Sequence, residues 1–284
     1  MDRHVRRSAR HMAVAAAVVL TASACGSDGD PGSASTSDTQ SSVAPSTAPG
    51  LSLVVIGDSI PYNSPDDCPG CAGFVDRYAD AVESAIGEPV DVQNLSQHTG
   101  LTLPDLLTGL DGLSDALADA DVILVAIAHN SSELNADEPC GTPLDPNDLP
   151  VWSEIDQECA VASAAEYRPQ CESLFSQVAA LRGTQPTILR TVNRYNDWIG
   201  WPEVTLGPDE NGSTKLILDA WNAMICEVAE ANGFGCADIY SAFNGPDGLE
   251  PAGDLLAADY THPSEAGNEL IAEILVEMGF APLG

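Results

Sequence analysis

The chain has 284 residues, and 10 lysines and arginines against 43 aspartates and glutamates give it a formal net charge of −33. Its apolar fraction of 44% is ordinary for a globular protein and too high for a disordered chain. An excess of negative charge repels phosphate backbones and anionic lipid surfaces. We therefore expect neither nucleic-acid binding nor membrane binding through basic patches.

The first 24 residues are expected to be an export signal. Four arginines lie within residues 3–10, and the apolar run at residues 12–20 is about half the ~20 residues that a membrane-spanning helix needs. Small residues then lead to Cys25, and the segment resembles a bacterial lipoprotein signal, which implies lipidation of that cysteine. The alternative is ordinary cleavage after residues 22–24 and free secretion.

A polar tether is expected at residues 25–50. Residues 26–50 contain 17 Ser, Thr, Gly or Pro in 25 positions, without apolar periodicity, and a random coil of this length reaches about 25–30 Å. Residues 51–284 then form one predicted domain, because no internal repeat or second linker interrupts them.

Within this domain, short apolar runs alternate with segments of helical periodicity. Strands are predicted at residues 51–56, 89–93, 121–127, 186–192 and 235–239. Helices are predicted at residues 73–86, 103–118 (in two pieces, broken at Gly109 and Gly112), 153–181, 213–231 and 263–278. This alternation predicts a three-layer α/β/α sandwich with a five-stranded parallel sheet.

Ligands of parallel sheets lie at the carboxyl ends of the strands, so the residues that follow each strand are the first candidates for a site. Ser59 follows the first strand directly, where a nucleophile would be accessible. A serine nucleophile needs a base, which is normally histidine. Only His98, His129 and His262 remain after removal of the predicted signal.

Asp259 and His262 precede the last predicted helix. A carboxylate three residues before a histidine can curl back onto its Nδ1 and leave Nε2 facing a nucleophile. Taken alone, either Ser59 or this pair would be read as ordinary polar turn residues.

Together, residues 57–59 (Gly-Asp-Ser) and 259–263 (Asp-Tyr-Thr-His-Pro) resemble the outer motifs of the SGNH (GDSL-type) hydrolase family. Residues 94–102 are similar to the family's second motif, with one extra residue before Gly100. Residues 127–130 are similar to its third, with Ala128 where the family has glycine and Asn130 as the matching asparagine. The resemblance covers the domain from residue 51 to its end and implies a flavodoxin-like fold.

The resemblance also implies a mechanism. Ser59 would attack an ester carbonyl, His262 would transfer the proton, and Asp259 would orient the imidazole. The oxyanion would be held by the backbone N–H groups of Ser59 and Gly100 and the side-chain amide of Asn130. The chain is therefore predicted to be an exported serine esterase without a cofactor. The alternatives are an acyltransferase that uses the same site and a catalytically silent binding protein.

Several other residues are candidates for the substrate pocket. They are His98, His129, Tyr195, Trp198 and Trp201. The aromatic residues follow the fourth strand and suit an acyl or sugar platform, although a cluster that fills a long loop is an equal interpretation. Residues 131–150 are a candidate partial lid. No metal site is expected, because the three histidines lack ligand spacing.

The remaining cysteines are predicted to form three disulfides and leave one free thiol, as suits an exported protein. They are Cys68, Cys71, Cys140, Cys159, Cys171, Cys226 and Cys236. A small disulfide is expected for Cys68 and Cys71, with a redox or zinc half-site as alternatives. Cys226 is expected to pair with Cys236, and the third pair comes from the other three cysteines.

The expected partner is a small-molecule, lipid or glycan ester. We expect contact with a membrane only through a lipid on Cys25, a location on the outer face of the cell membrane or outside the cell, and a monomer.

Overall fold

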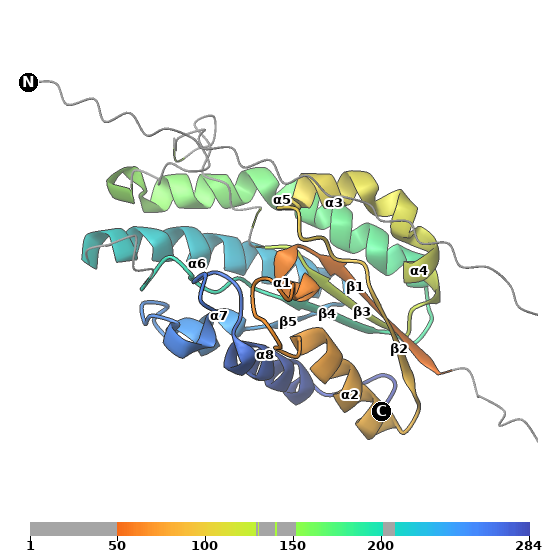
Figure 1. Cartoon of the computed structure of the whole chain (residues 1–284). Coiled ribbons are helices and arrows are strands. Elements are labelled where there is room, and N and C mark those ends of the chain that lie inside the picture. Colours follow the sequence, from red (N-terminus) through yellow and green to blue (C-terminus); the bar gives the residue numbers. More distant parts are fainter. Residues whose placement is uncertain (1–49, 129, 131–139, 141–151, 201–207) are drawn as a thin grey trace, which may run out of the picture. The chain divides into compact units, whose positions relative to one another are not determined.

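The computed structural model describes residues 50–128, 130, 140, 152–200 and 208–284 (Figure 1). The predicted signal and tether lie outside the described residues, as do His129, Trp201 and nearly all of the candidate lid.

Five strands form one parallel sheet, as the sequence predicts. They are β1 (Leu51–Gly57), β2 (Val90–Asn94), β3 (Val122–Ala126), β4 (Ile188–Val192) and β5 (Gly235–Ala237). Their spatial order is β2-β1-β3-β4-β5, and the register pairs Leu53 with Val122 and Val55 with Asn94 (Figure 1). This order is the flavodoxin-like one, in which the direction of winding changes between β1 and β3 and leaves a crevice at the carboxyl edge.

Helices cover both faces of the sheet. They are α1 (Ser59–Tyr62), α2 (Phe74–Ile86), α3 (Leu103–Gly109), α4 (Ser114–Asp119), α5 (Gln157–Arg182), α6 (Pro208–Ala231), α7 (Ile239–Asn244) and α8 (Glu265–Glu277). In the part of the chain that the structure describes, short 3₁₀ helices lie at Leu110–Leu113, Trp152–Glu154 and Gly253–Leu255. The predicted break between α3 and α4 is confirmed.

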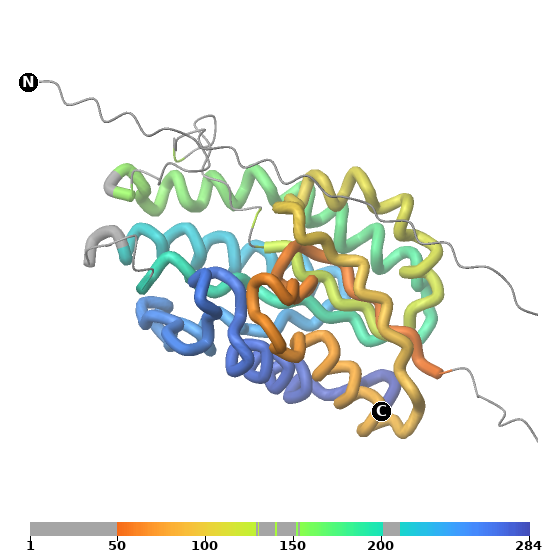
Figure 2. Tube along the Cα trace, in the orientation of Figure 1, coloured from red at the N-terminus to blue at the C-terminus, as the bar shows by residue number. Residues whose placement is uncertain are grey.

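Two apolar cores hold the layers together, because successive side chains of a strand point to opposite faces. In β1, Val54 and Ile56 pack with α3, α4, α5 and α6. Leu53 and Val55 pack with α2, α7 and α8 on the other face. Figure 2 shows these two groups of helices on opposite sides of the sheet. The sheet is therefore buried on both sides, and substrate can reach it only at an edge.

Two helices were not expected from the sequence, and three strands are shorter than predicted: β3, β4 and β5. α1 is a single turn that begins at Ser59. β5 ends at Ala237 instead of residue 239, because the Asp238 side chain accepts a hydrogen bond from the N–H of Ser241 and caps α7. A local cap therefore ends the apolar run that predicted the longer strand.

The two ends of the domain meet at one place. The N–H of Leu51 donates to the carbonyl of Pro89 at 2.8 Å, and the last residue, Gly284, lies against Ile86. Both ends therefore lie at the turn between α2 and β2, at the amino edge of the sheet (Figure 1).

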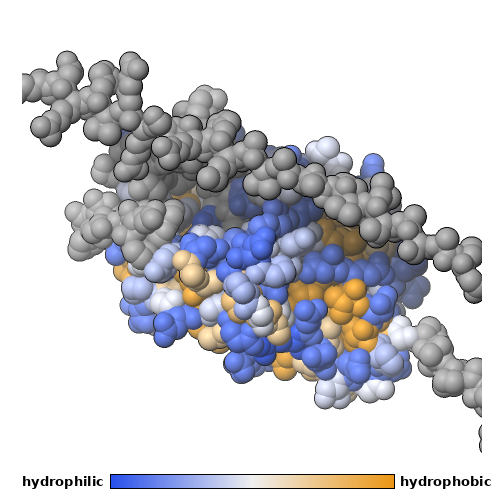
Figure 3. Space-filling view, in the orientation of Figure 1, coloured by the Kyte–Doolittle hydropathy of each residue, from blue (hydrophilic) through white to orange (hydrophobic). Residues whose placement is uncertain are grey.

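None of the helices in the described residues is long and apolar enough to cross a membrane. The face shown in Figure 3 is largely hydrophilic over the residues that the structure describes.

Candidate active site

Ser59 is placed at the carboxyl end of β1 by a tight, capped turn. It is the first residue of α1, and the buried Asp58 caps this helix by accepting a hydrogen bond from the N–H of Ile60 at 3.0 Å. The Asp58 N–H donates to the carbonyl of Ala126 on β3. The N–H of a first helical residue has no partner within its helix, so that of Ser59 is available to an acceptor in the crevice.

Only glycine fits directly before this turn. A Cβ atom on Gly57 would lie 2.0 Å from the carbonyl oxygen of Ala126 and 2.8 Å from Cγ of Pro61. The close approach of β1 to β3 therefore explains the glycine of the Gly-Asp-Ser motif.

Asp259 and His262 lie on a loop that folds back on itself before α8. Leu256 and Pro263 form an antiparallel bridge, and the Ala257 N–H donates to the carbonyl of His262 at 2.8 Å. Tyr260 at the tip has a left-handed φ of 61°. Contacts within its own backbone thus hold the shape of this loop without the help of side chains.

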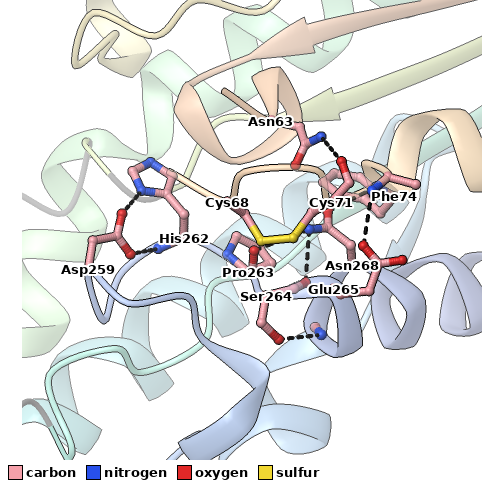
Figure 4. The surroundings of a disulfide bond; sticks show 12 residues. Asn63, Cys68, Cys71, Phe74, Asp259, His262, Pro263, Ser264, Glu265 and Asn268 are labelled. Carbon is pink, nitrogen blue, oxygen red and sulfur yellow. Dashed lines mark hydrogen bonds and ion pairs between the residues drawn. A yellow bond between two sulfur atoms is a disulfide. The ribbon is translucent and has the colours of Figure 1, made fainter. Parts of the chain in front are cut away.

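The two side chains pair as the sequence predicts. Nδ1 of His262 is 2.6 Å from one carboxylate oxygen of Asp259 (Figure 4). The other oxygen accepts the N–H groups of Thr261 and His262, each at 3.0 Å. Burial raises the pKa of Asp259, but these hydrogen bonds outweigh burial and hold it below its ordinary value. The carboxylate therefore stays ionised and fixes the imidazole with its proton on Nδ1.

Nε2 of His262 is buried and makes no hydrogen bond to any described residue. The structure gives no hydrogen bond between it and Ser59 either, and catalytic hydrogen bonds are often long in proteins without substrate. This lone pair is free to accept a proton.

Two buried side chains hold the Asp259–His262 loop in place. The Tyr195 hydroxyl donates to the carbonyl of Thr261 at 2.6 Å, and its ring stacks on Phe243 with centroids 4.4 Å apart. Asn268 on α8 accepts the N–H of Phe74 at 2.9 Å and donates to the carbonyl of Pro263 at 3.2 Å. The start of α2 and the start of α8 are thereby joined.

The position of Tyr195 matches the second of the two interpretations left open by the sequence, an aromatic cluster that fills a long loop. Its side chain is fully buried, and burial raises the pKa of its hydroxyl well above the ordinary value. It therefore supports the loop that carries His262. A single aromatic residue in a loop does not reveal which neighbour it will stack on.

The predicted oxyanion donors lie on neighbouring loops. Gly100 follows β2 with a left-handed φ of 69° and no atom near its missing Cβ. Asn130 follows β3, and its amide donates to the carbonyl of Leu101 at 3.3 Å. Asn94 ties the same β2 loop to the nucleophile turn, because its amide donates to the carbonyl of Pro61 at 2.7 Å. The second and third motifs therefore meet at the edge where Ser59 lies.

Asp67 is the residue that the sequence analysis missed. It lies between α1 and α2, and its Oδ2 is 2.8 Å from Nε2 of His98 and 3.4 Å from Nε2 of His262. Three loops far apart in the chain supply these groups, so no local pattern could have revealed their meeting. His98 is thus brought beside the predicted base, with ring centroids 5.8 Å apart.

The loop after β4 is held rigidly beside the site. Trp198 packs edge-on against Trp152, and the Arg194 guanidinium lies 4.2 Å from the Trp198 ring centroid. Arg194 also forms a buried ion pair with Asp197 at 3.1 Å. Trp198 thus belongs to a packed cluster, the second of the two interpretations that the sequence left open.

A cavity of about 360 Å³ opens between this loop and the Asp259–His262 loop. It is lined by Ile199, Gly200, Pro251, Gly253, Asp254, Leu256, Ala257, Ala258 and Tyr260. Of the loop after β4, Ile199 and Gly200 line this cavity.

The three disulfides connect Cys68 with Cys71, Cys140 with Cys159, and Cys226 with Cys236. Two of these pairs are as predicted, and the third selects one of the alternatives. Cys171 is the free thiol among the described cysteines, and it is buried.

The Cys68–Cys71 disulfide lies beside the start of α8, near Pro263 and Asn268, as Figure 4 shows. The Ala72 N–H donates to Glu265 at 3.0 Å, and Arg77 pairs with the same carboxylate. The segment that carries Asp67 is therefore attached to the helix that follows His262.

Comparison with solved structures supports the fold. The lipase Lip_vut3 from a goat rumen metagenome is similar with a TM-score of 0.63 and 19% identity, over 82% of this chain and 100% of that one. Phospholipase A1 from Streptomyces albidoflavus NA297 gives 0.56 and 17%, over 80% and 99%. The extracellular lipase of Streptomyces rimosus gives 0.54 and 15%, over 80% and 99%. At these identities the likeness shows the fold.

None of the curated proteins compared matches the chain. The profile of the GDSL-like lipase/acylhydrolase family, however, matches residues 55–270, which hold Ser59, Asp259 and His262. Family and fold agree, and the chain belongs to the GDSL-like lipase/acylhydrolase family as an SGNH-type serine ester hydrolase.

Proposed function

We propose that this protein is an exported esterase that hydrolyses carboxylic esters through an acyl-serine intermediate on Ser59, with His262 as base and Asp259 as its orienting carboxylate. The observation that carries the proposal is the 2.6 Å contact between Asp259 and Nδ1 of His262, which leaves Nε2 buried and without a hydrogen bond to any described residue.

Acylation begins when Oγ of Ser59 attacks the ester carbonyl and its proton passes to Nε2 of His262. The resulting oxyanion is held by the N–H groups of Ser59 and Gly100 and the amide of Asn130, each donor being worth about 10²–10³ in rate. Collapse of the intermediate breaks the ester C–O bond, and His262 returns its proton to the leaving alkoxide. Water then repeats the sequence on the acyl-serine, releases the acid and restores Ser59.

Ser59→Ala provides the test. On a panel of p-nitrophenyl esters of increasing acyl length, kcat/KM of this variant is expected to fall by about 10⁴–10⁶. Labelling by a fluorophosphonate probe should be lost as well. Ser84→Ala, which removes an exposed hydroxyl from α2, is the matched control and should keep both.

Two results would overturn the proposal. A wild type as inactive as Ser59→Ala over the whole panel would favour a binding protein that keeps the fold. Retained hydrolysis in Ser59→Ala together with loss in Cys68→Ala would place the chemistry on the thiols. The panel also identifies the acyl length that the enzyme accepts.

We further propose that the protein is held at the outer face of the cell membrane by a lipid on Cys25. The basic start, the short apolar run and the polar residues after Cys25 support this location. Mass spectrometry of the mature N-terminus tests it. A diacylglyceryl group on Cys25 is the expected result, and an unmodified N-terminus beyond residue 24 would indicate free secretion.

A further inference from the structure

Three side chains of types that bind metal ions converge in the structure, and one of them is the predicted catalytic base. They are Asp67 from the segment between α1 and α2, His98 from the loop after β2, and His262 from the loop before α8. One ligating atom of each lies within 4.8 Å of the other two.

Their spacing fits a small cation. Zinc bonds to histidine nitrogen and carboxylate oxygen are about 2.0–2.2 Å long, so neighbouring ligand atoms of a tetrahedral ion lie about 3.3–3.5 Å apart. Oδ2 of Asp67 is 3.4 Å from His262 Nε2, which lies within that range, and 2.8 Å from His98 Nε2, which is shorter. The His98 side chain is 37% exposed, so it has room to turn and bring the third pair of atoms to the same spacing.

The donor set is also chemically suitable. Two imidazole nitrogens and one carboxylate oxygen are ligands that zinc prefers, with one coordination position left for water. Nε2 of His262 is buried and has no hydrogen-bond partner among the described residues. Asp259 holds its other nitrogen at 2.6 Å, the carboxylate–histidine arrangement that commonly supports a bound metal.

The same lone pair has two possible uses. Nε2 of His262 can accept the proton of Ser59, or it can bind a cation, but one electron pair cannot serve both. A bound ion would therefore compete directly with acylation.

We propose that Asp67, His98 and His262 form a Zn²⁺ site, and that zinc reversibly inhibits ester hydrolysis by occupying Nε2 of His262. The inhibitory part rests on the proposed function, whereas the binding part does not. No bond of the substrate is made or broken by the ion, and binding requires only a neutral imidazole on each histidine.

Zinc binding is measured first, by calorimetry on the whole chain after treatment with a chelator. We expect one Zn²⁺ per chain. Asp67→Asn and His98→Gln should each weaken binding at least about tenfold. Asp66→Asn, which alters the exposed neighbouring carboxylate, is the matched control and should bind as the wild type does. Mg²⁺, which prefers oxygen ligands, should not compete.

Inhibition is measured next, as the initial rate of ester hydrolysis against free Zn²⁺, with each variant scaled to its own zinc-free rate. The wild type should be inhibited with a constant equal to the calorimetric Kd. His98→Gln should need at least about ten times more zinc, and a chelator should restore the rate. Thermal unfolding of each variant shows that it is folded, which keeps the comparison valid.

The outcomes separate the two proposals. Absence of zinc binding by a folded wild type, or binding that His98→Gln and Asp67→Asn leave unchanged, overturns the site. Zinc binding that leaves the wild-type rate unchanged overturns the inhibition. Specific zinc binding by a protein that hydrolyses no ester would uphold the site and reject the proposed function.

Discussion

At the scale of single residues, the two carboxylate oxygens of Asp259 have different partners. One oxygen fixes the loop backbone at Thr261 and His262, and the other fixes the imidazole. An amide in this position keeps the shape but can hold the imidazole in the wrong tautomer, with its proton on Nε2.

Asp259→Asn is therefore expected to lower kcat by about 10²–10⁴ with a smaller change in KM. Steady-state kinetics measure this, with Asp247→Asn, an exposed carboxylate of another loop, as control.

Because the pKa of Asp259 is held below its ordinary value of 3.8, the stability that this group contributes is complete above about pH 4. The difference in unfolding free energy between wild type and variant should shrink as pH falls below 3.8. Unchanged kcat would refute the orienting role.

Cys171 carries a free thiol that is buried in the core. Burial raises the pKa of its thiol to about 12 from an ordinary value of 9.0. Because a group with a raised pKa keeps its proton in the folded state, the stability that it contributes is present below pH 9 and is lost between pH 9 and 12.

Urea unfolding should accordingly show the free energy of unfolding falling with pH in that window, by at most about 1.4 kcal/mol per pH unit from this group. Cys171→Ala should flatten this part of the profile. Alkylation provides a second measurement, since the native thiol should resist iodoacetamide at pH 8 and react once the chain is unfolded. Rapid alkylation of the native protein would show that Cys171 is accessible.

At the scale of elements, the site depends on contacts between loops. Tyr195, from the loop after β4, supports the carbonyl of Thr261 in the loop before α8. Tyr195→Phe leaves that carbonyl unsatisfied and should cost about 1–3 kcal/mol of stability.

The loop should also lose its fixed position, so kcat should fall while KM changes little. Tyr240→Phe is the matched control, because this buried hydroxyl donates to the carbonyl of Gly248 on a different loop. The control should lose stability with little loss of kcat. Equal kcat losses in both variants would show that the effect is general destabilisation.

Elements with local signals could be predicted from the sequence. The apolar runs located all five strands, and Gly109 and Gly112 marked the break between α3 and α4. The single turn of α1 is too short for a periodic pattern, and α7 begins with a cap inside a run that reads as strand. The helices α1 and α7 could therefore be located only from the tertiary structure.

The residues of the candidate site likewise divide into those with a local sequence signal and those without one. Ser59, Asp259 and His262 could be identified because each lies in a short motif directly beside a predicted element. The meeting of Asp67 with His98, and the burial of Tyr195, depend on how distant loops pack, which no local pattern contains. The sequence thus predicts the candidate catalytic residues, and the fold identifies their neighbours.

At the scale of the whole molecule, charge is the dominant property. After residue 10 the chain has only six lysines and arginines. Each of them is engaged, four in ion pairs and the other two, Arg182 and Arg190, with backbone carbonyls. The many remaining carboxylates repel one another.

Salt should therefore stabilise the protein. Raising NaCl from 10 mM to 500 mM shortens the screening length from about 30 Å to less than 8 Å, which weakens this repulsion. Each kcal/mol gained should raise Tm by about 2–4 °C, which differential scanning calorimetry can measure. Sodium sulfate at equal ionic strength separates screening from anion effects. A Tm that falls with NaCl would show that attractive ion pairs outweigh the repulsion.

The meeting of Leu51 and Gly284 at the turn between α2 and β2 makes the domain a candidate for circular permutation. A short linker could join these ends, and the chain could be reopened on the exposed turn between β4 and the preceding helix α5. The order in which the strands are synthesised would change, while Ser59 and His262 would keep their places at the opposite edge of the sheet. Fusion partners could then be attached at new termini, with the crevice remaining open to substrate.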